Sequence, residues 1–223
     1  MLDRRTLLTG MMALPALGAP PAWAAVPVAQ DFVVRRNGAA IGHRRLRFRE
    51  KGSRLVVEID IELEVKLAFL TLYRYRHSNR EVWEGDRLLG FASRTDDNGT
   101  AHAVTARRLG GRLLVEGAAG PPEVPGDAPP TTYWHRRFLD HDRWIDSQSG
   151  RLVSCTVTPK GREPVEALGK FLEAERFAVS GDLALDLWYA GDHWVGMAFA
   201  GPDGSAIDYR LERGGPVRLA AAR

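Results

Sequence analysis

Cysteine is nearly absent from this chain, which has only Cys155 among its 223 residues. A single cysteine excludes a disulfide within the chain. It lies in the strand-like run 152–158, where a buried thiol is expected to pack as a small apolar side chain. Long hydrophobic runs are also missing. The longest apolar stretch, near the N-terminus, is shorter than the roughly 20 residues that a membrane-spanning helix needs.

The sequence also lacks the motifs of the common enzyme classes. There is no Gly-x-Ser-x-Gly nucleophile turn, and no glycine-rich phosphate loop precedes a helix. Asp96-Asp97-Asn98-Gly99 lacks the acid spacing and the distal glutamate of a calcium loop, so we interpret it as a hairpin turn. We therefore predict no catalytic residue, no metal site and no cofactor.

Two histidines leave one enzyme alternative open. On a helix, His135 and His141 would lie on opposed flanks, which is poor geometry for binding one metal ion. A hydrolase acting outside the cytoplasm remains an alternative if His135, Asp140 and Asp142 converge in one pocket.

An excess of charge of one sign is missing as well, because the formal net charge is only +3. Between residues 54 and 66, acids and bases follow one another at alternate positions, as in Glu58, Asp60, Glu62 and Lys66. This pattern is typical of the solvated face of a sheet. Nucleic-acid-binding domains instead gather basic residues on one face, so no nucleic-acid partner is expected.

The N-terminus carries the features of an export signal. Arg4-Arg5 precedes a short apolar run, residues 7–17, and Ala22-Trp23-Ala24 follows with small residues at the cleavage positions. A charged start, an apolar middle and a small-x-small end are typical of a signal peptide, and the arginine pair favours the twin-arginine route. We predict a signal over residues 1–24, cleavage between Ala24 and Ala25, and a mature protein over residues 25–223. It would be periplasmic or secreted, and not an integral membrane protein after cleavage.

Alternation of apolar and polar residues dominates the rest of the chain. Val57, Ile59 and Ile61 alternate with Glu58 and Asp60, which is the pattern of a half-buried antiparallel strand. Similar strands recur about every ten residues with turn sequences between them. The pattern predicts a single all-β domain, a large curved antiparallel meander that forms a half-barrel or is barrel-like.

Four segments carry more specific expectations. Residues 69–83 are predicted to form one long strand, or two strands joined by a bulge near Ser78. Residues 117–130 hold five prolines, and this composition predicts a Pro-rich loop without strand or helix. Residues 131–140 are predicted to form one short helix. Residues 159–162 are expected to form a turn.

Eight stretches of the sequence carry a resemblance to a known family. They are Gly42-His43, Val65-Lys66-Leu67-Ala68-Phe69, Leu72-Tyr73-Arg74-Tyr75-Arg76-His77, Asn79-Arg80-Glu81-Val82-Trp83, Ser93-Arg94-Thr95-Asp96-Asp97-Asn98-Gly99, Tyr133-Trp134, Gly181-Asp182-Leu183 and Leu187-Trp188-Tyr189. In these stretches the sequence resembles an uncharacterised family of exported bacterial proteins, domain of unknown function 6134. The resemblance implies a signal-bearing β-protein, distantly similar to curved sheets of the periplasmic lipoprotein-carrier type. It implies no catalytic residues, because the family has no established activity.

Two groups of residues are candidates for ligand binding. Arg74, Arg76 and Arg80 are predicted either to meet an acidic head group or to form cross-strand ion pairs on an exposed face. The second group either fills the core or lines a concave apolar groove beneath the Pro-rich loop. It consists of Trp134, His135, Trp188 and Tyr189.

These candidates lead to two functional expectations beside the hydrolase. The first is a module that binds a lipid or another apolar small molecule on the concave face of the sheet, with residues 117–140 as its lid. The second is an interaction module for other envelope proteins, without small-molecule chemistry. Fold alone does not decide between them.

Overall fold

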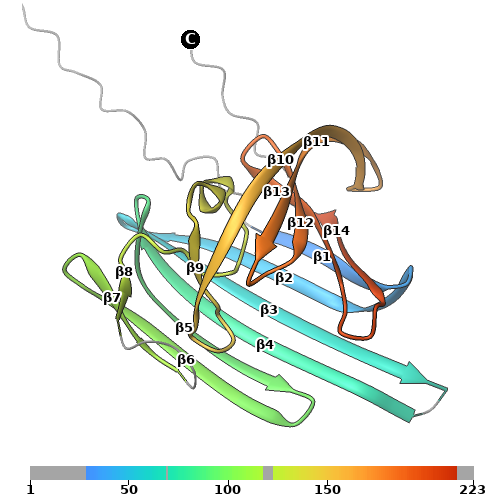
Figure 1. The fold of residues 1–223 in the computed structure, drawn as a ribbon, viewed down its shortest axis with the longest axis horizontal. Helices are drawn as coiled ribbons and strands as arrows, with labels where there is room; N and C mark the ends of the chain where they lie inside the picture. Colours follow the sequence, from blue (N-terminus) through green and yellow to red (C-terminus); the bar gives the residue numbers. More distant parts are fainter. Residues whose placement is uncertain (1–28, 69, 118–122, 215–223) are drawn as a thin grey trace, which may run out of the picture.

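A computed structural model describes residues 29–68, 70–117 and 123–214. They form a single antiparallel sheet of fourteen strands (Figure 1). The predicted signal and its cleavage point between Ala24 and Ala25 lie outside the described residues. The strands are β1 Ala29–Arg36, β2 Ala39–Lys51, β3 Arg54–Leu67, β4 Leu70–Glu84, β5 Arg87–Asp97, β6 Thr100–Leu109, β7 Arg112–Glu116, β8 Glu123–Pro125, β9 Arg143–Ile145, β10 Leu152–Ala167, β11 Lys170–Gly181, β12 Leu185–Ala190, β13 His193–Ala200 and β14 Ala206–Arg213.

The sheet consists of two meanders joined by one pairing between distant strands. Its order is β8-β7-β6-β5-β4-β3-β2-β1-β14-β13-β12-β11-β10-β9, so only β1 and β14 are neighbours that do not follow one another in sequence. In Figure 1 the long strands β2 to β6 form one layer, and β10 to β14 cross over it. The two end strands, β8 and β9, do not pair with each other. The predicted curved meander is therefore confirmed as an unclosed half-barrel.

The alternation in the sequence determines which side chains face the interior. Val57, Ile59 and Ile61 on β3 are buried, whereas the acids between them are less buried or exposed. The hairpin between β1 and β2 turns at Asn37 and Gly38, both with positive φ, a conformation that favours this pair of residues in tight hairpins. Alternation and turn chemistry therefore agree along the first meander.

The long strand predicted within residues 69–83 is confirmed, because β4 is continuous through Ser78. The register shifts of its pairings lie elsewhere, at Val65/Lys66 and Val82/Trp83. A prediction in the second meander needs correction. The expected turn at residues 159–162 is instead a bulge within β10, because Pro159 and Gly161 interrupt the register without reversing the chain. The reversal comes later, around residues 168–169, where both residues have positive φ.

The Pro-rich segment contains a strand that its composition did not predict. β8 is three residues long and pairs with β7, with Val124 opposite Leu113. Its proline, Pro125, lies at the end of a strand that has only one neighbour, a position where a missing N–H is tolerated. Residues 118–122 of this segment lie outside the described residues.

A chain segment fills the space between the two layers of the half-barrel. We call residues 126–150 the inner segment. It contains a short 3-10 helix, Arg136–Asp140, within the range where one short helix was predicted. Trp134, Phe138 and Trp144 of this segment are buried, and Trp134 lies edge-on to Trp83 of β4 at 5.6 Å between ring centroids. The predicted lid thus packs inside the sheet.

No helix in the described part of the chain has the length and apolarity needed to cross a membrane.

Candidate binding site inside the half-barrel

The inner segment leaves part of the interior unfilled. A partly open cavity of about 270 Å³ remains between the two layers, beside the loop at residues 146–148. Its wall is mostly apolar and aromatic, and its rim includes the exposed Ala184. The lining residues are Arg44, Ile61, Tyr75, His77, Thr131, Thr132, Tyr133, Asp146, Ser147, Gln148, Leu183, Ala184, Leu185, Met197, Phe199 and Tyr209.

Three neighbouring strands supply one row of this wall. Arg44 on β2 lies opposite Ile61 on β3, and Ile61 lies opposite His77 on β4. Residues directly opposite each other on antiparallel strands point to the same face. The row therefore places a guanidinium and an imidazole on the concave face, on either side of an aliphatic residue.

The guanidinium of Arg44 is buried without an ion pair. Its side chain is 3% exposed, and Nη2 donates a hydrogen bond to the Thr132 carbonyl at 2.5 Å. The guanidinium carbon lies 4.7 Å from the ring centroid of Trp194 and 5.9 Å from that of Tyr133, distances at which cation–π attraction acts. Nε has no hydrogen-bond partner, so the donor set of this side chain is incomplete.

Burial shifts the protonation of the groups around the cavity. It lowers the pKa of Arg44, while the nearby Tyr209 and Tyr133 oppose that shift. It also lowers the pKa of His77 to about 4, and the positive charge of Arg44 adds to this effect. His77 is therefore neutral at pH 7, and its Nδ1 is 2.8 Å from Thr95 Oγ1.

The acid on the cavity wall is bound within its own turn. Asp146 Oδ1 accepts a hydrogen bond from the Gln148 amide at 3.0 Å, and Oδ2 accepts one from Ser149 Oγ. By contrast, the Tyr209 hydroxyl has no hydrogen-bond partner among the described residues, although this residue is only 7% exposed. The Arg44 guanidinium, which has no ion pair in the described part of the chain, and the Tyr209 hydroxyl thus both belong to residues on the cavity wall.

The filled end of the interior holds a second buried charge-bearing group, Glu81. It is 0% exposed and accepts hydrogen bonds from Trp83 Nε1 at 2.7 Å, Trp134 Nε1 at 2.9 Å and Asn79 Nδ2 at 3.3 Å. Burial raises the pKa of this carboxyl, against the effect of the indole donors. Glu81 joins β4 to the inner segment and has partners for both oxygens.

The structure does not bring the three predicted arginines to the concave face. Arg74, Arg76 and Arg80 are exposed and alternate along β4 with inward residues such as His77. Arg74 pairs with Glu64 at 2.8 Å, and Arg80 lies 3.8 Å from Glu58. These contacts match the cross-strand ion pairs of the alternative interpretation, because the three arginines lie on the outer face of the half-barrel.

The second candidate group is divided among three locations. Trp134 and Tyr189 are buried in the core, where the Tyr189 hydroxyl donates to the Tyr133 carbonyl at 2.7 Å. Trp188 is half-buried, donates to Glu163 at 2.7 Å and contacts the Arg176 guanidinium. His135 caps the 3-10 helix by accepting a hydrogen bond from the Arg137 amide. None of the four lines the cavity.

The residues of the hydrolase alternative lie outside the interior cavity. Asp140 and Asp142 are exposed, and neither they nor His135 lines the cavity. Across residues 29–68, 70–117 and 123–214, no group of three or more His, Cys, Asp or Glu side chains is arranged to hold a metal ion.

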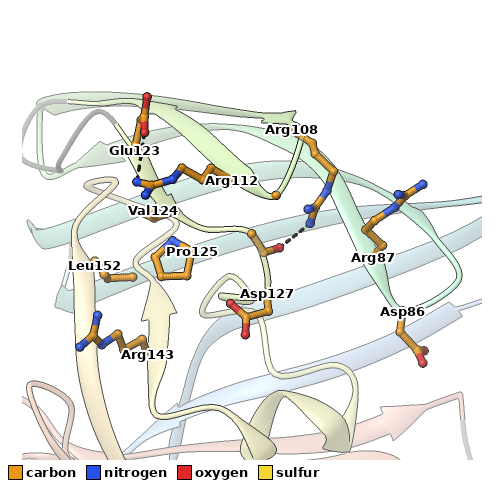
Figure 2. Close-up of a pocket in the computed structure, with 12 residues that line it drawn as sticks. Asp86, Arg87, Arg108, Arg112, Glu123, Val124, Pro125, Asp127, Arg143 and Leu152 are labelled. Atoms are coloured by element: carbon orange, nitrogen blue, oxygen red, sulfur yellow. Dashed lines mark hydrogen bonds and ion pairs between the residues drawn. The ribbon is translucent and has the colours of Figure 1, made fainter.

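A larger, shallower groove of about 1060 Å³ follows the seam where the sheet fails to close. Figure 2 shows β8 on one side of it, with Arg143 and Leu152 opposite. Most of its charged groups are engaged already. Arg112 pairs with Glu123 at 3.2 Å, and Arg108 donates to the Leu88 and Gly126 carbonyls. The interior cavity is therefore the better candidate site.

The sequence contained a signal for the buried charges that its interpretation missed. Arg44 shares its strand face with Leu46 and Phe48, and Glu81 shares its face with Trp83. A charged residue at an apolar position of an alternating strand indicates a buried polar contact. That signal names both residues, but it does not tell which of them faces a cavity.

Comparisons with known proteins agree with this architecture. A search of curated proteins found no match. A beta-barrel-like protein of domain of unknown function DUF1849 from Brucella abortus, known from its crystal structure, has a similar fold. The TM-score is 0.56 at 12% sequence identity, covering 86% of this chain and 98% of that one. The model of the family DUF6134, a domain of unknown function, matches residues 32–212. The chain therefore belongs to the DUF6134 family.

Proposed function

We propose that this protein is an exported binding or carrier module that holds a small amphipathic molecule inside its half-barrel. The observation that carries the proposal is the partly open cavity between the two layers, with an apolar wall and a few polar groups. Concave sites of this composition are where proteins bind small ligands. The export signal predicted for residues 1–24 supports a location outside the cytoplasm.

The size of the cavity restricts the ligand. A volume of 270 Å³ lies just below the range of about 300–1,000 Å³ that is typical of pockets for small ligands. This space suits a single short or medium acyl chain, or a compact aromatic compound, but not a whole diacyl lipid. The wider concave groove expected beneath a lid is taken up by Trp134 and its neighbours.

Native mass spectrometry combined with lipid extraction tests the proposal, on mature protein purified from the compartment where it accumulates. We expect a bound molecule that is small and amphipathic. The variant Ala184→Trp places a large ring at the cavity rim and should abolish its retention. Ala101→Trp makes the same change at an exposed position of β6 and should retain the molecule. An apo mass for the wild type, with no binding of added amphiphiles, would overturn the proposal.

A second candidate function, contact with another envelope component, is favoured by one observation. Leu70 and Leu72 are 58% and 51% exposed beside the turn between β3 and β4. Isolated apolar side chains at a surface are common, but a pair at one hairpin is a candidate contact point. Crosslinking through a photoreactive residue at position 72, with one at the exposed outer position Arg94 as control, would detect a partner specific to the hairpin.

A further inference from the structure

The buried guanidinium of Arg44 indicates which chemical group the cavity holds. A cation removed from water is stable only when hydrogen bonds or an opposite charge replace its hydration. Arg44 makes one hydrogen bond to a carbonyl and lies over two aromatic rings, yet Nε has no partner. Among the described residues, no carboxylate lies within ion-pairing distance of it.

The acidic residues of the interior do not supply an opposite charge to the Arg44 guanidinium. Glu81 is bound by the indoles of Trp83 and Trp134, and the oxygens of Asp146 are bound within its own turn. The remaining electrostatic neighbours of Arg44 are tyrosines, with Tyr209 the strongest of them. The Tyr209 hydroxyl is a second donor on the same wall, free to bind an anion.

We propose that the ligand is a carboxylic acid whose carboxylate binds Arg44 and the Tyr209 hydroxyl. This proposal rests on the proposed function, the binding of a small amphipathic molecule in the cavity. A guanidinium and a carboxylate match in geometry and charge, and their hydrogen bonds are stronger than those between neutral groups. The apolar part of the acid lies toward the rim, against side chains that line the rest of the cavity. These are Leu183, Leu185, Met197 and Phe199.

This arrangement differs from a purely structural role of Arg44. As a structural element, Arg44 would only join β2 to the inner segment through the Thr132 carbonyl, and the charge of an added ligand would not matter. As a binding group, it discriminates between an acid and an uncharged molecule of the same shape. The contrast can be measured on the wild-type protein without any substitution.

The test is calorimetric titration of the mature protein with octanoate, octanol and acetate at pH 7. We expect octanoate to bind about tenfold or more tightly than octanol, because a hydrogen bond to a charged group contributes more than one to a neutral group. Acetate should bind much more weakly than octanoate, because it lacks the apolar chain. Tighter binding of acetate would instead identify a water-soluble acid as the ligand and remove the lipid-like part of the proposal.

Variants at Arg44 complete the test. Arg44→Met should abolish the preference for octanoate while octanol still binds, and Arg44→Lys should keep part of that preference because it keeps the charge. Arg76→Met removes an exposed arginine of the outer face and should change nothing. If octanoate and octanol bind wild type equally, the assignment of Arg44 is overturned while the proposed function stands. If none of the three probes binds, the proposed function itself fails.

Discussion

The two ends of the half-barrel interior each bury one charge-bearing side chain, and they treat it differently. At the filled end, Glu81 receives hydrogen bonds from two indoles and an amide. At the open end, Arg44 keeps an unpartnered Nε beside a cavity. His77 of the open row and Glu81 are four residues apart on β4, about 13 Å along a strand. Within that distance the interior changes from a core into a site.

A charged side chain can be buried to hold the fold together or to bind a ligand. A buried ionisable group with all its partners fixes the position of neighbouring elements, as Glu81 fixes the inner segment against β4. A buried group that has a donor without a hydrogen-bond partner lowers the stability of the folded protein. A cavity beside such a group leaves space for a ligand. The contrast predicts different responses to substitution at the two ends.

The largest expected effect is at the filled end. Trp134→Ala should lower the free energy of unfolding by about 3–5 kcal/mol, because the ring is buried among Phe48, Trp83 and Phe138. Chemical denaturation measures this change. Trp188→Ala, on the half-buried outer face, is the matched control and should cost less than half as much. Equal losses would show that the inner segment is not part of the core.

The free energy of unfolding should depend on pH through His77, which lies at the open end of the interior. The pKa of His77 is lowered from 6.5 to about 4, so below pH 6.5 the unfolded chain binds a proton that the folded protein does not. The free energy of unfolding should therefore fall by roughly 3 kcal/mol as the pH falls from about 6.5 to 4. Each pH unit within this range contributes about 1.4 kcal/mol. Arg44 opposes protonation, and Asp146 favours it.

Chemical denaturation of the wild type and of His77→Gln across this pH range isolates the contribution of His77 to stability, because both proteins contain all the other titrating groups. The difference in stability between the two proteins should narrow steadily from pH 6.5 to pH 4. Parallel profiles would mean that His77 is accessible to solvent in the folded protein.

A matched pair of substitutions compares the two charges directly. Both indoles donate to Oε2 and the Asn79 amide donates to Oε1, so Glu81→Gln places its amide N–H against either the two indoles or the Asn79 donor, and should destabilise the protein by about 1–3 kcal/mol. Arg44→Met replaces an unpaired buried charge with an apolar side chain of similar length, and should be nearly neutral in the ligand-free protein. Thermal unfolding of both variants, each compared with the wild type, measures the two losses of stability. A larger loss for Arg44→Met would assign Arg44 a structural role.

The smallest effect is expected on the outer face. Arg80→Gln removes a long-range contact to Glu58 at 3.8 Å between two largely solvated side chains. Such pairs contribute little in water, so the change in unfolding free energy should stay within about 0.5 kcal/mol. A substantial loss would show that the contact between Arg80 and Glu58 contributes more than a solvated ion pair does.

Most of the fold was predictable because strand alternation and hairpin turns are local features. The Asn37-Gly38 turn and the apolar row of β3 are examples in which sequence and structure agree. The bulge at Pro159 and the short strand β8 were missed because a neighbouring strand determines both. Turn-forming residues at a bulge look the same in sequence as those at a reversal.

The candidate site was less predictable than the fold. The alternation of β4 places Arg76 and His77 on opposite faces, but it does not show which face is concave. Whether an inward arginine meets a carboxylate or a cavity depends on how far the inner segment, more than eighty residues later in the chain, fills the space. No local pattern contains that information, so Arg44 was recognised only in three dimensions.

The order of strands also constrains when the fold can be completed. Every neighbouring pair of strands is close in sequence except β1 and β14, whose residues Val34 and Tyr209 lie opposite each other. During synthesis, each meander can assemble by successive hairpins, but the two must wait to join until the last strand has left the ribosome. The cavity draws its wall from both meanders, so it cannot exist before then, and a chain shortened by its last strand would have none.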